Sequence, residues 1–295
     1  MLIINEREFV EYVLVSKDLG SEPAATLFRV QKYYASLGFN RSEVSRKTSE
    51  LIRMSAPMDM ERLEAIAADM IKNAMHEPLV ELGFIPITVS EMDKIEVLKS
   101  LPLRKLAFTL LVLSKYHTAV RPESSGWITE SDAQLFALAN VNAPRDKHGL
   151  MLNDIAQAGL ISFANTVDSA SVRVLFGTPG TEAMRITDMR NLGYQYARYI
   201  GVGRYKPCAT CGLLVPATSN KWQTQIRCPR HADMQAKAHP VVCESCGSVF
   251  IAPNKSKTAL CPACYDERRK LDMRRNSARH RTLTKRTTKD TSQAM

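Results

Sequence analysis

Apolar residues recur at every third or fourth position through the first hundred residues, which is the period of helices that bury one face. Gly20 and Gly38 fall where apolar runs end, and glycine at such positions favours termination of a helix. The short apolar, β-branched run Phe84–Val89 is typical of a strand or of an extended linker, and Ser90 with Asp93 can cap the helix after it. The predicted helices are Glu6–Lys17, Glu22–Leu37, Ser42–Met54 and Met60–His76. We therefore expect a helical domain over residues 1–100.

The second and third of these helices, joined at Gly38, have the lengths of a helix-turn-helix motif. Arg41, Arg46 and Lys47 on the third helix are therefore candidate contacts to phosphate. Any two packed helices joined by a glycine turn share this pattern, so the alternative is a purely structural pair.

Residues 101–200 carry a second pattern, in which three helical stretches precede two short strands. Leu106–Leu113 is apolar on all sides, which predicts a helix buried within a larger body. Thr129 is expected to cap the second helix. The predicted elements are helices Pro102–His117, Glu130–Asn140 and Pro144–Gly159 and strands Leu160–Ala164 and Ser171–Phe176.

This order of elements resembles a winged helix. The resemblance implies that the third helix reads DNA, with basic side chains on phosphate and the amides of Asn153 and Gln157 on adenine edges. Asp146 and Asp154 weaken the charge of that helix, and many winged helices are protein-docking platforms, so protein docking is the alternative. The candidate contacts are Arg145, Lys147, His148 and, on the wing, Arg173.

Tyrosines and arginines alternate between residues 194 and 205. Exposed rings of Tyr194, Tyr196 and Tyr199 could stack on unpaired bases while arginines hold the backbone. Alternatively, the same tyrosines pack a helix onto the body, and Gly201 and Gly203 then form a hinge to the C-terminal part.

Composition and charge indicate the class of protein and the kind of molecule that it binds. The chain has 295 residues, of which 45% are hydrophobic and 24% charged, as in globular proteins. The net charge is +10, but residues from Gly201 onward hold 18 Lys and Arg against 6 Asp and Glu, whereas the first 200 hold 22 against 24. A basic C-terminal part on a near-neutral body indicates binding to a polyanion; the alternative is a solvated basic tail with no specific partner. No leader or membrane span is visible, so we expect a cytoplasmic protein, on the nucleoid if DNA is bound.

All seven cysteines lie between residues 208 and 264, in pairs at one repeated spacing. One histidine completes a fourth pair, so that eight ligands could form two closed tetrahedral zinc sites. Sequential pairing is favoured over a cross-brace, since the linker after His231 suits independent fingers; His239 is a reserve ligand for His231. The predicted ligands are Cys208, Cys211, Cys228 and His231 for one site and Cys243, Cys246, Cys261 and Cys264 for the other.

Proline follows the first cysteine of each distal pair, and it suits the first turn of a helix. A glycine-ended knuckle, a hairpin and a helix whose start supplies two ligands resemble a treble-clef finger. The spacing of the second finger is similar to GATA and nuclear-receptor modules, which implies that its last helix enters the major groove. The candidate nucleic-acid contacts on that helix are Arg268, Arg269, Lys270, Arg274, Arg275, Arg279 and Arg281.

Together these patterns predict a mainly α chain: a helical body with a winged-helix-like unit, then two small zinc-stabilised β/α fingers and a basic C-terminal helix. The expected domains are 1–100, 101–200, a first finger at 201–240, a second with its helix at 241–281, and a disordered tail at 282–295. The architecture resembles DNA-binding proteins of bacterial phages and integrative elements.

The expected function is that of a transcriptional regulator or DNA-transaction accessory factor bound to double-stranded DNA. RNA or single-strand binding is one alternative, and a protein-interaction adaptor is another, with the helical body serving an oligomer or protein partner. Closed metal sites offer no open position to activate water, and no phosphate loop or dinucleotide fingerprint is found. We therefore expect no enzyme activity.

Overall fold

A computed structural model describes residues 2–55, 59–164, 171–217, 226–229, 232, 239–252, 260–261, 263–265 and 267–273. The chain divides into two compact units. The first, here called the body, comprises residues 1–206 and 213–220; the second, the finger unit, comprises residues 207–212 and 221–295. Among the helices described, none combines the length and the apolar character needed to cross a bilayer.

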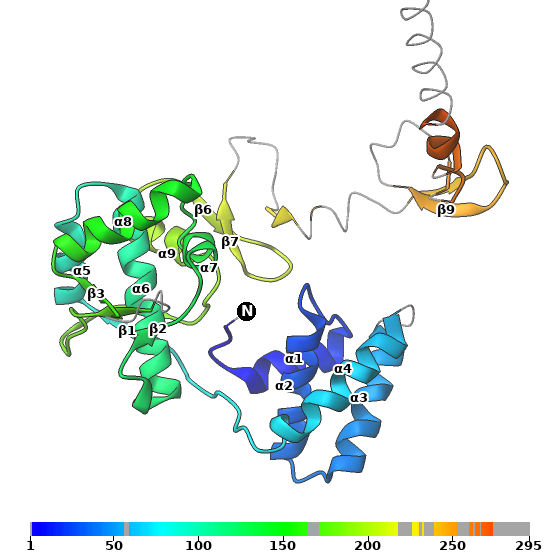
Figure 1. Cartoon of the computed structure of the whole chain (residues 1–295), viewed down its shortest axis with the longest axis horizontal. Coiled ribbons are helices and arrows are strands. Elements are labelled where there is room, and N and C mark those ends of the chain that lie inside the picture. Colours follow the sequence, from blue (N-terminus) through cyan, green and yellow to red (C-terminus); the bar gives the residue numbers. More distant parts are fainter. Residues whose placement is uncertain are drawn as a thin grey trace, which may run out of the picture. The chain divides into compact units, whose positions relative to one another are not determined.

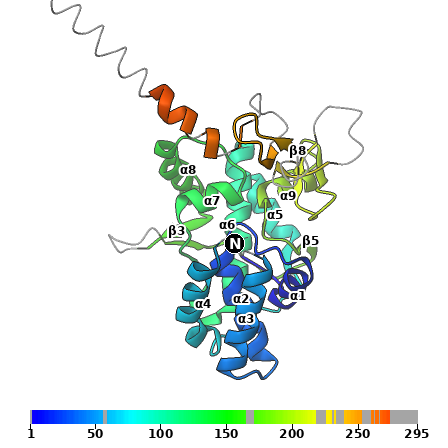
Figure 2. The ribbon, with the colours of Figure 1, turned by 90° about the vertical axis from the view of Figure 1, so that its right-hand side faces the viewer.

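The first four helices pack around an apolar cluster of their own within the body (Figure 2). They are α1 (Glu6–Ser16), α2 (Pro23–Ser36), α3 (Arg41–Ser55) and α4 (Met60–Ala74). Asn5 caps α1 by accepting the Glu8 N–H, and Pro23 begins α2. Val10, Leu27 and Leu51 are at most 1% exposed in the cluster, so the predicted helical period buries the expected face.

A buried ion network fastens the start of α1 to the chain after α4. The Lys32 ammonium lies 2.7 Å from a carboxylate oxygen of Glu6 and 3.3 Å from one of Glu77. Arg29 also contacts Glu6 at 3.2 Å, and Glu6 accepts the backbone N–H of Val80. Each charge is therefore paired and hydrogen-bonded, as burial requires.

The candidate phosphate contacts of the α2–α3 pair take part in contacts of their own. The Lys47 ammonium lies 4.6 Å from the ring centre of Phe39 and 5.4 Å from that of Tyr34. Arg46 is exposed and lies 3.8 Å from Glu50. The α2–α3 geometry thus uses Lys47 as a packing group beside two aromatic rings.

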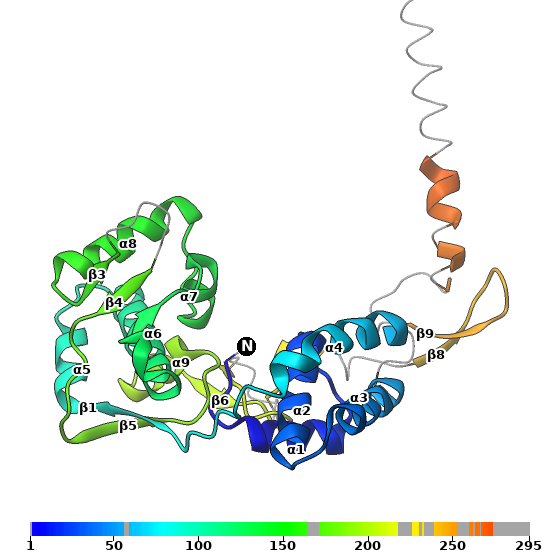
Figure 3. The same ribbon diagram turned by 60° about the horizontal axis from the view of Figure 1, so that its bottom comes forward.

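The rest of the body is built around α6 (Leu101–Val120). Leu106 to Leu113 are all fully buried, which confirms the burial predicted from their all-round hydrophobicity. Figure 3 shows α6 beside α9 (Leu192–Tyr199) and the antiparallel pair β1 (Ile85–Thr88) and β5 (Glu182–Ile186). Helix α5 (Val89–Glu96) follows β1. Thr88, and not Ser90, caps it in a capping box with Glu91, so that expectation was wrong by two residues.

The second and third helices of the 101–200 region are α7 (Asp132–Leu138) and α8 (Arg145–Gln157). Ser131, and not Thr129, provides the capping box of α7 with Gln134. Strands β3 (Ile161–Phe163) and β4 (Val172–Val174) pair as predicted. A strand that the sequence pattern did not reveal, β2 (Trp127–Ile128), adds to the other edge of β4 and gives the sheet order β2-β4-β3. A 3₁₀ turn at Pro122–Ser124 precedes β2.

Two small hairpins accompany the cysteines. β6 (Tyr205–Pro207) pairs with β7 (Leu214–Pro216), and β8 (His239–Val242) pairs antiparallel with β9 (Val249–Ala252). Residues 263–265 and 267–273 are helical and are drawn in orange and red in Figure 1. Each cysteine knuckle therefore forms the turn of a hairpin, whereas the sequence predicted a knuckle followed by a hairpin.

Candidate metal centres and nucleic-acid interface

Four cysteines of the finger unit converge on one point. The sulfur atoms of Cys243, Cys246, Cys261 and Cys264 all lie within 4.8 Å of one another, and those of Cys246 and Cys261 are 3.7 Å apart. A tetrahedral ion with Zn–S bonds of ~2.3 Å would separate its sulfurs by about 3.8 Å. None of the described cysteines forms a disulfide, and the spacing in this cluster is too wide for one. The cluster could therefore hold a metal ion.

The backbone of this cluster is shaped for sulfur ligands. Gly247 adopts a left-handed conformation (φ +71°), which lets its N–H donate to the carbonyl of Cys243 at 2.9 Å. Cys243 donates its own N–H to Ser248 O. The N–H of Cys261 donates to Sγ of Cys243 at 3.3 Å, and the Tyr265 N–H bonds Cys261 O as the helix begins. The knuckle and the helix start thus present two ligands each.

The thiols of the four-cysteine cluster differ in how readily they lose their protons. Hydrogen bonding from the Cys261 N–H stabilises the thiolate of Cys243 and lowers the pKa of that thiol to about 6. The side-chain hydrogen bond with Cys261 keeps the proton on Cys264 and raises its pKa to about 12. Because a coordinating metal deprotonates thiols outright, a bound ion would remove this difference.

A second cluster has three described ligands. The sulfurs of Cys208, Cys211 and Cys228 share the same mutual limit of 4.8 Å, and Cys211 and Cys228 are 3.9 Å apart. Gly212 repeats the knuckle, with φ +71° and its N–H bonded to Cys208 O. The predicted fourth ligand, His231, lies outside the described residues.

The grouping of the cysteines follows their order along the chain. The first and second pairs share one cluster, and the third and fourth share the other. This is the sequential arrangement, and a cross-brace would have joined Cys208 to Cys243. Ser248, whose Oγ lies 3.0 Å from Sγ of Cys246, was not anticipated; its place directly after Cys-Gly is the only signal.

Basic residues follow the second cluster at once. Arg268, Arg269 and Lys270 are exposed on the helical segment 267–273. The apolar residues beside them are exposed too, with Leu271 at 53% and Met273 at 56%. The predicted contacts Arg274, Arg275, Arg279 and Arg281 lie outside the described residues.

The candidate contacts of α8 and β4 differ in their availability. Arg145, Lys147 and Arg173 are exposed. His148, in contrast, stacks on Phe136 with ring centres 3.7 Å apart, and its Nε2 lies 3.1 Å from Ala143 O. The His148 ring is therefore engaged in packing α8 on α7.

The tyrosines of α9 face the body in two of three cases. Tyr196 is fully buried, with its ring centre 5.2 Å from that of Phe108. Tyr194 stacks on Tyr205 at 4.9 Å. Tyr199 alone of the three is exposed, at 47%. Packing accounts for Tyr194 and Tyr196 better than base stacking.

Comparison of the chain with family models, curated proteins and solved structures finds no match.

Proposed function

We propose that this chain is a zinc-containing protein that binds double-stranded DNA, as a transcriptional regulator or an accessory factor of DNA transactions. One observation carries the proposal. Arg268, Arg269 and Lys270 lie exposed on a helix that starts at a four-cysteine metal cluster. A metal-anchored start fixes where that helix begins, and its cations suit a phosphate backbone. The closed sites serve the fold and supply no chemistry.

The donor sets support zinc as the metal. Sets of four sulfurs, or of three sulfurs and an imidazole, are those of structural zinc. We propose one zinc ion in each cluster, with His231 as the fourth ligand of the first.

The body is proposed to contain a winged helix made by α6, β2, α7, α8, β3 and β4. The support is the strand β2 between the first two helices and the sheet order β2-β4-β3, which close the three helices with a small sheet. The exposed residues Arg145, Lys147 and Arg173 would then add weaker phosphate contacts.

A duplex is favoured over single strands because of the tyrosines. Stacking on unpaired bases needs free aromatic faces. Tyr196 is buried and Tyr194 is covered by Tyr205, so Tyr199 is the exposed one of the three tyrosines of α9. We also propose that the protein acts on DNA in the cytoplasm, in a bacterial or mobile-element system.

The test is a charge reversal in the full chain. Replacement of Arg268, Arg269 and Lys270 by glutamate should weaken binding to a duplex probe at least about tenfold at low salt. The matched control reverses Arg62, Lys72 and Lys99, which are exposed on the body and change the net charge equally. Fluorescence anisotropy with duplex DNA, single-stranded DNA and RNA gives the affinities.

If both variants lose the same affinity for duplex DNA, the effect is one of net charge alone, and the proposed interface is contradicted. Preferential binding to single-stranded DNA or RNA would favour the single-strand alternative. Absence of binding to any probe would leave the protein-adaptor role.

A further inference from the structure

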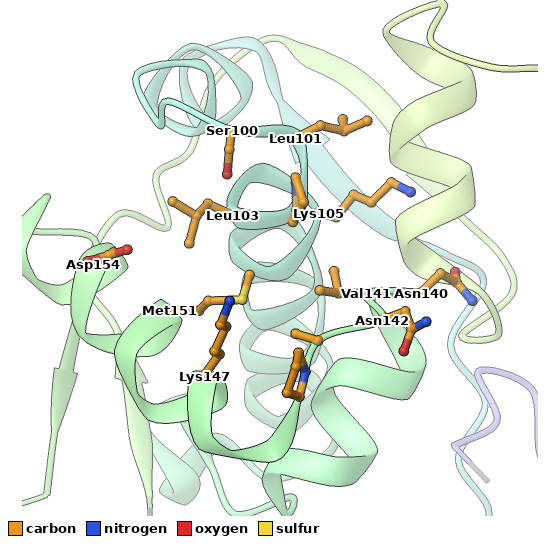
Figure 4. A pocket seen from close by; sticks show the side chains of 13 residues that line it. Ser100, Leu101, Leu103, Lys105, Asn140, Val141, Asn142, Lys147, Met151 and Asp154 are labelled. Atoms are coloured by element: carbon orange, nitrogen blue, oxygen red, sulfur yellow. The ribbon is translucent and has the colours of Figure 1, made fainter.

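A cavity opens in the body between the start of α6, the loop before α8 and one side of α8 (Figure 4). Its volume is about 420 Å³, which lies within the range of roughly 300–1,000 Å³ found for small-molecule sites. Leu103, Val141 and Met151 contribute apolar walls, and a few polar groups stand among them. A concave apolar site with few polar groups is the usual form of a ligand pocket.

Lys105 is the most buried of the charged residues that line the cavity, and Figure 4 shows its side chain extending toward the neighbouring helix. Only 8% of the residue is exposed, and its ammonium lies 5.3 Å from the ring centre of Tyr194. Among the residues that the structure describes, no carboxylate forms an ion pair with it. Burial lowers the pKa of Lys105, because it penalises the charged form. An anion beside the ammonium would offset that penalty.

Two further features of the lining suit an anion. Ser100 at the N-cap of α6 makes no side-chain hydrogen bond to the first turn, and that turn has no acidic residue. Because Pro102 has no N–H and the Arg104 N–H bonds Ser100 O, the first turn offers an anion the N–H groups of Leu101 and Leu103, together with the positive end of the helix dipole. Lys147 lines the opposite wall, and Figure 4 shows its amine directed toward Met151.

One acidic residue sets the orientation of a ligand. Asp154 also lines the cavity, and Figure 4 places it at the far side from Lys105. An anionic group would be repelled at the Asp154 end and attracted at the Lys105 end. The apolar side chains of Leu103 and Met151 lie between the two ends.

We propose that this cavity binds an amphipathic organic anion, with its carboxylate or phosphate head at Lys105 and its apolar body along Leu103 and Met151. The cavity shares Lys147 with the proposed DNA contacts of α8 and shares no residue with the metal clusters; the proposal does not rest on DNA binding.

The experiment uses full-length protein labelled with ¹³C at methionine methyl groups, with the Met151 signal assigned from Met151→Leu. Hexanoate and hexyl phosphate are the probes; hexan-1-ol has the same chain without charge, and acetate has the charge without the chain. At least one anionic probe should shift the Met151 signal saturably, and the two controls should bind at least about tenfold more weakly. The tighter of the two probes identifies the head group.

Lys105→Met should weaken that binding at least about tenfold, whereas Lys99→Met, an exposed control, should leave it unchanged. If Lys105→Met does not fold, Lys147→Met at the exposed opposite wall should still weaken it several-fold. No saturable shift, an equal shift with hexan-1-ol, or a shift insensitive to both lysine variants would overturn the proposal.

Discussion

Glu91 is a single side chain that joins three separate segments of the body. It is fully buried, and its carboxylate accepts the N–H of Thr88 at 2.8 Å and that of Thr178, 87 residues away in sequence, at 2.9 Å. The Lys115 ammonium of α6 lies 2.7 Å from the same carboxylate. Since a buried charge is tolerated only when it is paired and hydrogen-bonded, each partner depends on the others.

Glu91→Gln should therefore destabilise the body by roughly 3 kcal/mol, because it leaves the Lys115 charge without its partner. Lys115 retains some exposure, which holds the cost toward the lower end of buried pairs. Chemical denaturation followed by far-UV circular dichroism measures the change. Glu96→Gln, an exposed position on the same helix, should shift stability by no more than about 0.5 kcal/mol. Equal effects would show that the network is dispensable.

Residues whose chemistry is local were the predictable ones. The cysteine pattern predicts a metal cluster, because two residues between the cysteines and a glycine after them are enough to build a knuckle, as the hydrogen bond of Gly247 shows. Tyr196 and Tyr199 look alike in sequence, yet one is buried and the other exposed. Their difference depends on Phe108, a distant partner that no local pattern reveals.

Helices and strands also differ in whether nearby or distant residues determine them. The long helices could be predicted, since the period of apolar residues lies within each helix. β2 has only two residues and therefore no period, and its partner β4 lies more than forty residues later. β1 and β5 pair across about one hundred residues, so neither strand could be assigned to the other. The caps Thr88 and Ser131 were missed although each has a Glu or Gln three residues later, which is the local pattern of a capping box.

The helix after Cys261 should depend on its metal. Cys264→Ser removes one ligand, so the zinc content should fall from two ions per chain to about one, and the amides of residues 267–273 should exchange faster with deuterium. Helix α6 should remain protected, since it lies in the other unit. Ser248→Ala, which removes a contact to Cys246 but no ligand, should keep both ions. Unchanged zinc in Cys264→Ser would contradict the four-sulfur site.

At the scale of the whole molecule, the positive charge and the two cysteine clusters lie in the same part of the chain. The 18 basic and 6 acidic residues from Gly201 onward can be counted in the sequence alone. The boundaries of the two units, in contrast, can be found only from the structure. Residues 213–217 belong to the body, where Leu214 O accepts from Asn191 Nδ2 at 2.8 Å, and no local sequence pattern reveals this contact.

The salt dependence of DNA binding should report how many of these cations meet phosphate. If the seven candidate cations predicted for the last helix each neutralise one phosphate, the log–log slope of affinity against salt is roughly −6, since each contact contributes about −0.9. Deletion of residues 274–295 removes four of the seven and should flatten the slope by about 3.6, whereas deletion of 265–295 removes all of them. Anisotropy titrations of the full chain and both truncations, between 50 and 200 mM salt, measure the three slopes, a range in which such proteins lose about 10³-fold or more in affinity. A slope that stays the same in both truncations would assign binding to the body, where Arg145, Lys147 and Arg173 are the exposed candidates.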